Sequence, residues 1–406
     1  MTEVKEKSGF MGFKRNIYAL GLVSLFTDIS SEMAYPLIPD LMKAVGAGAA
    51  ALGVVEGVAE ATASVMKAVS GYVSDRFGKR KQPVFIGYLM SGLAKPLLGL
   101  AVSWPLILLI RFSDRMGKGI RTAPRDALLA DSSPPDKMGA AFGLHRAMDT
   151  MGAVLGPALA YFLLHGMGVG LTSVFILAAV PAAIGLAVIG AGVKEVPPRR
   201  AKSGPFRFSF KDLSPGLKRF ILVSGLFSLG NFPAVFLILR CRELGIDTDH
   251  VILIYLLNNL VYSLTSLPAG ALSDRIGRKA MLTAAYLMFA AVFAAGAMAA
   301  TPLHAVIVFM GYGVFQGIYE GSSRALLADL EPSERRASSY GVLHAVIGMA
   351  MLPGGIMAGA LWKFAGAPAA FGLSAAIGVA AAVLFVVLVS PPAAPATEKN
   401  IAPPEQ

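Results

Sequence analysis

Cysteine is nearly absent from this chain of 406 residues, in which Cys241 stands alone. One cysteine excludes an internal disulfide and a cysteine cluster for zinc or iron–sulfur. The five histidines show no metal-binding spacing such as H-x-x-x-H, and no G-x-x-x-x-G-K-S/T phosphate loop occurs. We therefore expect no cofactor, no resident metal and no ATP-driven mechanism.

Charge is scarce as well. Charged residues make up 15% of the chain and apolar residues 55%, whereas soluble domains carry about a quarter charged residues. Such a chain cannot cover its surface in water, so we expect neither a soluble domain nor an enzyme. The 44 glycines suit helices that pack closely in lipid. The composition predicts an all-α membrane protein that crosses the bilayer several times.

Twelve apolar segments are each long enough to cross a bilayer, which takes about 20 residues. A polar stretch divides them into six and six. We expect an N-terminal bundle over 1–193, a cytoplasmic linker over 194–218, a C-terminal bundle over 219–390 and a disordered cytoplasmic tail over 391–406. The segments fall near 16–37, 49–73, 82–102, 104–129, 139–164, 170–193, 219–240, 249–273, 279–300, 302–329, 338–362 and 366–390.

Lysine and arginine are distributed unevenly between the loops at the two ends of these segments. The termini, the linker and one set of loops carry 23 of them, and the opposite loops carry four, which are Lys43, Arg240, Arg242 and Lys363. Cytoplasmic loops of membrane proteins collect basic residues. Both termini are therefore expected in the cytoplasm, in a multi-pass protein of the inner (plasma) membrane. The net charge of +11 needs no nucleic-acid partner to explain it.

The two halves of the chain repeat one another. GYVSDRFGKRK at 71–81 matches GALSDRIGRKA at 270–280, and ALLAD at 127–131 recurs at 325–329. A two-repeat array is typical of a transporter made of two similar bundles.

These features resemble the major facilitator superfamily over the whole chain. The loop signature of that family, G-x-x-x-D-R-x-G-R/K-R/K, occurs after the second expected helix and again after the eighth. The resemblance implies a monomer with twelve helices in two pseudo-symmetric six-helix bundles, which move small molecules by alternating access. The residues of this loop signature would form a latch that holds one conformation. They are Gly71, Asp75, Arg76, Gly78, Lys79, Arg80, Asp274, Arg275 and Arg278.

The fifth expected helix reads GAVLGP at 152–157, which resembles a motif of the drug–proton antiporter branch. Its small residues, Gly152 and Gly156 with Pro157, are expected to pack tightly against the eighth helix and seal the cavity. Generic packing of small residues between helices is the alternative interpretation.

The expected helix at 104–129 carries an unusual row of ions. At about 100° per residue they project within an arc of about 140°, which predicts one polar stripe facing a cavity. Each such ion costs on the order of 3 kcal/mol in hydrocarbon by insertion scales. The row consists of Arg111, Asp114, Arg115, Lys118, Arg121, Arg125 and Asp126.

Carboxylates of three other helices share faces by their spacing. Asp28 and Glu32 lie four residues apart, and so do Glu56 and Glu60, while Arg146 and Asp149 are three apart and expected to pair. Either they carry the coupling proton, or they only pair with the basic residues and lock the first half. The candidates for proton coupling are Asp28, Glu32, Glu56, Glu60 and Asp149.

The candidates for substrate binding are polar groups on both halves. The superfamily often has one buried arginine in its fourth helix, and both Arg111 and Arg115 fit that position here. The full set is Arg111, Arg115, Arg121, Arg125, Arg146, Asn231, Tyr319 and Glu320.

Three functions remain open on the sequence. The first is proton-coupled export of small organic solutes by antiport, with the proton as the coupling ion. The second is uptake or facilitated transport of an organic anion, or of a metal or metal chelate. Guanidinium groups pair well with carboxylate or phosphate, and a metal route would pass Asp28 and Glu32. The third, a non-transporting receptor or scaffold, is disfavoured by the two latch motifs and the buried ions.

Overall fold

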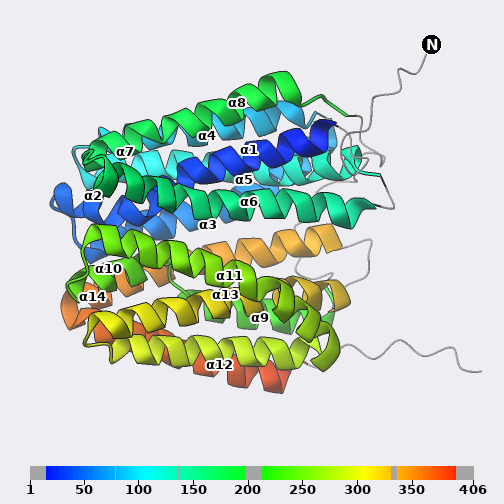
Figure 1. The fold of residues 1–406 in the computed structure, drawn as a ribbon. Coiled ribbons are helices and arrows are strands. Elements are labelled where there is room, and N and C mark those ends of the chain that lie inside the picture. The colour runs from blue at the N-terminus through cyan, green and yellow to red at the C-terminus, as the bar shows by residue number, and fades with distance from the viewer. Residues whose placement is uncertain (1–14, 78, 135–136, 197–212, 331–335, 390–406) are drawn as a thin grey trace, which may run out of the picture.

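The computed structural model describes residues 15–77, 79–134, 137–196, 213–330 and 336–389, and every regular element within them is a helix (Figure 1). Eight of the described helical segments are long and apolar enough to cross a membrane. The all-helical class expected from the composition is confirmed. The helix at Trp104–Ser132 is not among the eight although it has 29 residues, because its row of ions lowers its hydropathy.

The first half begins with a helix that proline interrupts. Pro36 and Pro39 lie where the helix tightens into a 3-10 turn and resumes, so the expected segment 16–37 continues to Ala44. The elements are α1 (Arg15–Ala34), η2 (Tyr35–Leu37), α2 (Ile38–Ala44), α3 (Ala49–Phe77), α4 (Lys81–Gly99), α5 (Trp104–Ser132), α6 (Met138–Tyr161), η4 (Phe162–Gly166), α7 (Leu171–Leu177) and α8 (Ala179–Gly192).

In the second half, side-chain caps and glycines mark several helix ends. Ser214 and Asp247 accept backbone N–H bonds at the starts of two helices. Gly277 and Gly366 adopt positive φ angles of 93° and 82°, where only glycine is unstrained. The elements are α9 (Pro215–Gly230), α10 (Val235–Glu243), α11 (Thr248–Ile276), α12 (Arg278–Ala297), α13 (Pro302–Leu330) and α14 (Arg336–Leu388), which is kinked at Gly366.

The helices of the two halves form two groups that face each other (Figure 1). In the first group α1 packs on α6 and α8, and α5 packs on α3 and α4. In the second, α14 packs on α9 and α12, and α11 packs on α13. The main contacts between the groups are those of α3 with α14 and of α6 with α11.

Glycine lines the contact between α3 and α14. A Cβ atom at Gly355 would lie 2.7 Å from the carbonyl oxygen of Gly53, and one at Gly359 would lie 2.6 Å from that of Ala49. Backbone therefore meets backbone at this contact, as small residues permit in membrane helices.

The expected packing of the GAVLGP motif is wrong. A Cβ atom at Gly152 would lie 2.5 Å from the carbonyl oxygen of Leu25, and one at Gly156 would lie 2.8 Å from that of Ile29. Both glycines therefore face α1 and not α11, the eighth long helix. The α6–α11 contact uses a different face of α6, where the Asn259 side chain donates to the carbonyl oxygen of Ala153 at 2.9 Å.

We predict that Gly355→Ala lowers the free energy of unfolding by about 1–3 kcal/mol, because the new methyl group cannot fit against α3 without shifting backbone. Gly372→Ala is the matched control on the same helix, since a Cβ there meets nothing within 4 Å. That change should gain up to about 1 kcal/mol of helix propensity. Unfolding by SDS titration in mixed micelles measures both; equal stability of the two variants would contradict the close contact.

Candidate functional site

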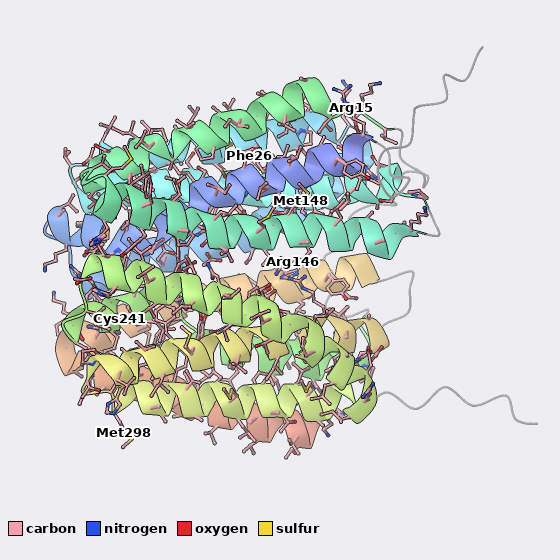
Figure 2. The ribbon with its side chains drawn as sticks, viewed as in Figure 1. Arg15, Phe26, Arg146, Met148, Cys241 and Met298 are labelled. Atoms are coloured by element: carbon pink, nitrogen blue, oxygen red, sulfur yellow. The ribbon has the colours of Figure 1, made fainter. Side chains whose placement is uncertain are left out.

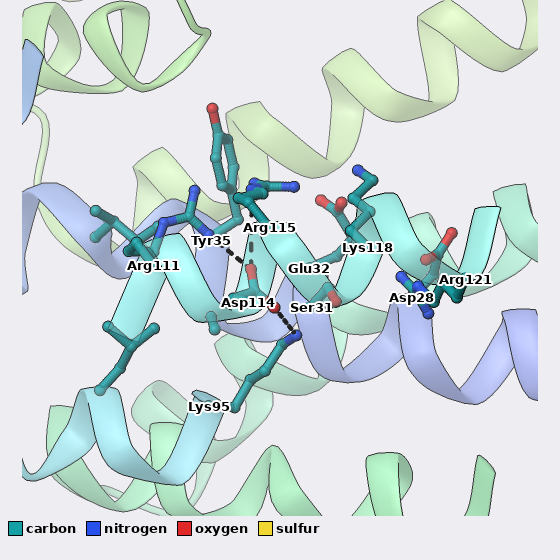
Figure 3. Close-up of a pocket in the computed structure, with 13 residues that line it drawn as sticks. Asp28, Ser31, Glu32, Tyr35, Lys95, Arg111, Asp114, Arg115, Lys118 and Arg121 are labelled. Carbon is teal, nitrogen blue, oxygen red and sulfur yellow. Dashed lines mark hydrogen bonds and ion pairs between the residues drawn. The ribbon is translucent and has the colours of Figure 1, made fainter. Parts of the chain in front are cut away.

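A small polar cavity lies inside the first half, between α1, α4 and α5 (Figure 3). Its volume is about 40 Å³, which is room for a few waters at most. The row of ions on α5 faces it together with carboxylates of α1, so the structure brings together the two groups of ions that the spacing placed on these faces. The polar groups that line it are Asp28, Ser31, Glu32, Tyr35, Lys95, Arg111, Asp114, Arg115, Lys118 and Arg121.

The most deeply buried ions form a compact network beside this cavity. Glu56 is fully buried and accepts bonds of 2.6–2.9 Å from two nitrogens of Arg111. Arg111 also donates to Asp114 at 3.2 Å, and the other oxygen of Asp114 binds the Lys95 ammonium at 2.7 Å (Figure 3). Each ion thus has a bonded partner, which offsets the cost of its burial.

The remaining basic residues of the stripe have weaker partners. Arg115 lies 3.6 Å from Glu60 and 3.8 Å from Asp114. Arg121 stacks on the ring of Tyr88, with 4.0 Å between its guanidinium carbon and the ring centre. Arg111 and not Arg115 is therefore the arginine locked by bonds to a fully buried carboxylate.

A second group of polar residues connects the two halves. The carboxyl groups of Asp28 and Asp149 lie within hydrogen-bonding reach of each other. Asp149 also accepts from the Ser24 hydroxyl at 2.6 Å and from Arg146 at 3.1 Å, the pair expected from spacing.

Arg146 continues this connection into the second half. Figure 2 shows it where the helices of the two halves face each other. Its guanidinium donates to the Tyr262 hydroxyl and lies 3.5 Å from Glu320. Tyr262 donates to Glu320 at 3.0 Å, and Arg324 approaches the same carboxylate at 3.4 Å. Glu320 therefore binds groups from both halves.

Further contacts tie the halves together toward the end of the molecule that contains Asp40. Tyr255 donates to Glu32 at 2.6 Å. Asp40 accepts from Arg242 and from Thr248, each at 3.0 Å. These contacts join the two halves at that end.

Asp247 sits in the connection that precedes α11, at the same end. The backbone N–H and the imidazole ring of His250 both hydrogen-bond to the Asp247 carboxylate. These bonds lower the pKa of the Asp247 carboxyl from its ordinary value, the backbone bond most. This carboxylate therefore remains an ionised cap of the helix.

The expected latch is described only in part. Gly78 and the side chains of Gly71, Asp75 and Arg76 lie outside the described residues. Lys79 is exposed, and Arg80 forms a buried ion pair with Asp131.

The second copy of the latch repeats this pairing. Arg278 pairs with Asp274 and lies 3.4 Å from Asp329, while Arg275 is exposed. Asp131 and Asp329 are the last residues of the two ALLAD repeats. Neither aspartate was among the predicted latch residues, although the repeat itself marks them.

Comparison with known proteins identifies the family. The profile of the Major Facilitator Superfamily matches residues 20–240 and 220–405. The chain belongs to this superfamily. An uncharacterised MFS-type transporter of Methanocaldococcus jannaschii is 38% identical over 355 residues, which cover 86% of this chain and 89% of that one. An uncharacterised protein of Mycobacterium tuberculosis is 28% identical over 361 residues, or 86% and 87% of the two chains.

Solved structures show the same fold. The human organic anion transporter MFSD10 (TETRAN) aligns with a TM-score of 0.67 at 17% identity, covering 91% of this chain and 99% of that one. A POT family transporter in complex with 5-aminolevulinic acid aligns at 0.79 and 12% identity, covering 94% and 97%. As a member of the major facilitator superfamily, the protein is a membrane-embedded secondary transporter of a small molecule and not an enzyme.

Five of the eight substrate-binding candidates do not line the cavity of this superfamily member, and two of these, Arg146 and Glu320, belong to the contact between the halves. Arg125 bonds its neighbour Asp126 at 2.8–2.9 Å. Asn231 ends α9, and Tyr319 stacks among aromatic rings of the second half, 5.3 Å from Phe227. The structure therefore does not gather the eight candidates into one site.

Glu56→Ala should destabilise this transporter by about 3–5 kcal/mol, because it leaves the Arg111 guanidinium buried without its main partner. Glu60→Ala is the control on the same helix: Glu60 is 28% exposed and lies 3.6 Å from Arg115, so its loss should cost far less. SDS titration compares the two variants, and a smaller loss for Glu56→Ala than for Glu60→Ala would contradict the network.

The two ion pairs should differ in strength, although each joins a basic residue of the latch motif to the last residue of an ALLAD repeat. Arg80 and Asp131 have side chains 8% and 9% exposed, whereas Arg278 and Asp329 are 25% and 40% exposed. Breaking a buried pair costs about 3–5 kcal/mol, and an exposed pair contributes about 0.2–1 kcal/mol. Asp131→Ala should therefore destabilise much more than Asp329→Ala in the same unfolding assay; equal losses would show that burial does not distinguish the pairs.

Proposed function

We propose that the protein is a proton-coupled secondary transporter that exports small organic solutes by antiport, in the manner of the drug–proton antiporter branch. The proposal includes twelve transmembrane helices in two six-helix bundles, a monomer in the inner membrane, and cytoplasmic termini. The kink at Gly366 divides α14 into two parts, which is consistent with twelve spans. The proton is the coupling ion, and no cofactor takes part.

The contact between Asp28 and Asp149 carries the proposal. A carboxylate only accepts hydrogen bonds, so two carboxyl groups can share one only when a proton is present between them. Two negative charges on neighbouring carboxyl groups repel each other strongly. The pair is therefore suited to bind and release a single proton.

Arg146 can couple that proton to the movement of the two halves. While the proton is bound, the Asp28–Asp149 pair has one negative charge and Arg146 is shared with Glu320 in the second half. Release of the proton adds a second negative charge beside Arg146 and draws its guanidinium away from Glu320. Deprotonation thus weakens the tie between α6 and the second half, and proton binding strengthens it.

The other carboxylates fit different roles. Two nitrogens of Arg111 hold Glu56, which favours a structural role over proton transfer. Glu60 stands opposite Arg115, and Glu32 accepts the hydroxyl of Tyr255 from the second half. Glu32 is therefore placed to respond when the halves separate, whereas Asp28 and Asp149 are placed to hold the proton.

A second candidate function is transport of an organic anion. The observation that favours it is the composition of the cavity wall, where basic residues outnumber carboxylates. Guanidinium and ammonium groups bind carboxylate, sulfonate or phosphate through charge-assisted hydrogen bonds. The basic residues are Lys95, Arg111, Arg115, Lys118 and Arg121, against Asp28, Glu32 and Asp114.

Proton flux in proteoliposomes tests the proposal. With a pH-sensitive dye inside and an imposed pH gradient, addition of tetraphenylphosphonium, 2-naphthalenesulfonate or ferric citrate should release protons for at least one compound. Asp28→Asn and Asp149→Asn should each abolish this substrate-dependent flux. Asp126→Asn is the control, because Asp126 is 45% exposed and pairs with Arg125 outside the cavity.

Two results would contradict the proposal. Flux that persists unchanged in both Asp28→Asn and Asp149→Asn would exclude the carboxyl pair as the proton site. Transport of the sulfonate or the citrate complex with no proton movement would replace antiport with facilitated anion transport. The sign of a substrate-dependent flux separates antiport from symport.

A further inference from the structure

Two lysines of the first half make no hydrogen bond or ion pair through their ammonium groups with any residue that the structure describes. They are Lys67 on α3 and Lys118 on α5, and both are half-buried. Lys118 lines the cavity and Lys67 does not. Of the other basic residues on the cavity wall, Lys95 and Arg111 bind carboxylates, Arg115 lies 3.6 Å from Glu60, and Arg121 stacks on an aromatic ring. These two lysines therefore have no hydrogen-bonded or ion-paired partner for their ammonium groups among the described residues.

Helix packing holds the two lysines at the same level. The Ser70 hydroxyl donates to the carbonyl oxygen of Gly119 at 2.8 Å, and a Cβ atom at Gly119 would lie 3.2 Å from the backbone nitrogen of Lys67. The backbones of α3 and α5 thus touch beside both lysines. Each ammonium lies within electrostatic reach of the other.

Lys67 also lies on the face of α3 that meets the second half. Ser64 packs against Gly348 of α14, and Ala68 lies 3.9 Å from the Cβ position of Gly341. Residues 64, 67 and 68 share one face of a helix by their spacing. From this face Lys67 is within electrostatic reach of Arg324, and both are within reach of His344.

The carboxylates in electrostatic reach of the two lysines already have other partners. Near Lys118, Asp28 contacts Asp149 and Glu32 accepts the Tyr255 hydroxyl, and Glu60 is in reach of both lysines. Glu60 stands 3.6 Å from Arg115, and Glu320 binds Tyr262, Arg146 and Arg324. Positive charges gathered between two helical groups repel one another. A mobile anion between Lys67 and Lys118 would remove that cost and would leave when the halves move apart.

We propose that Lys67 and Lys118 form a binding site for an organic anion, of the carboxylate or sulfonate class, in the contact region between the two halves. Arg324 of α13 closes the site from the second half. This inference rests on the proposed transport function and names a substrate class for it. Of the stripe expected on α5 the site uses Lys118 and not Arg111 or Arg115, which face carboxylates of the protein itself.

Equilibrium dialysis of the purified protein in phosphatidylcholine nanodiscs tests the site. The probe is radiolabelled 2-naphthalenesulfonate, which stays ionised at every working pH, and the neutral comparison is 2-naphthalenesulfonamide. Loss of one charged hydrogen-bond partner weakens binding by roughly ten-fold or more. Lys67→Gln and Lys118→Gln should each have this effect on the sulfonate and none on the sulfonamide, while Lys118→Arg should retain most of the affinity.

Lys43→Gln is the matched control, because Lys43 is exposed on α2 toward the opposite end of the molecule. Unfolding curves of all variants show whether a loss of binding reflects a loss of fold. Addition of phosphatidylglycerol to the nanodiscs distinguishes a solute site from a lipid site. Competition of this lipid with the sulfonate would reassign the site to a lipid headgroup and overturn the proposal.

The remaining outcomes separate this site from proton coupling. Equal affinity for sulfonate and sulfonamide, or unchanged sulfonate affinity in both glutamine variants, would overturn the anion site. Such a result would not contradict proton-coupled export of a cation or a neutral solute. That proposal is tested separately, by the proton flux of the Asp28→Asn and Asp149→Asn variants. Lysine-dependent sulfonate binding without any proton flux would retain the site and overturn the coupling.

Discussion

The pair formed by Glu56 and Arg111 is the interaction on which the first half depends. An ion inside a bundle that is surrounded by hydrocarbon is tolerated only when a partner offsets its desolvation. Arg111 meets this condition with bonds of 2.6–2.9 Å to Glu56, and it orients Asp114 toward Lys95. Because these bonds join α3, α4 and α5, they also fix the relative rotation of the three helices.

The contacts between the halves are of a different kind. Inside the first half the buried carboxylates Glu56 and Asp114 are bound by buried basic residues, whereas Asp149 and Glu320 of opposite halves share Arg146, whose side chain is exposed. A guanidinium between two carboxylates can change partner without becoming unpaired, so little free energy separates the two arrangements. Together with the glycine contact of α3 and α14, this allows the halves to move while the network within the first half stays intact.

Residue spacing predicted the faces of helices well and their partners poorly. The stripe on α5 and the carboxylates Asp28 and Glu32 line one cavity, as the helical period indicated. Gly152 and Gly156 indicated a close approach by another helix, but that helix is α1 and not α11. Small residues show that a neighbour comes near without identifying it. The pairing of Asp131 with Arg80 was not predicted either, because the ALLAD repeat marks Asp131 without identifying its partner.

The sequence by itself determined the class of the protein, its superfamily and the polar face of each helix, because hydropathy, repeats and helical period are properties of short segments. Only the tertiary structure decided that Arg111 belongs to Glu56, that Asp28 meets Asp149, and that Lys67 and Lys118 are left without an ionic partner among the described residues. Such pairings depend on the height and rotation of helices from distant parts of the chain, which packing between them sets.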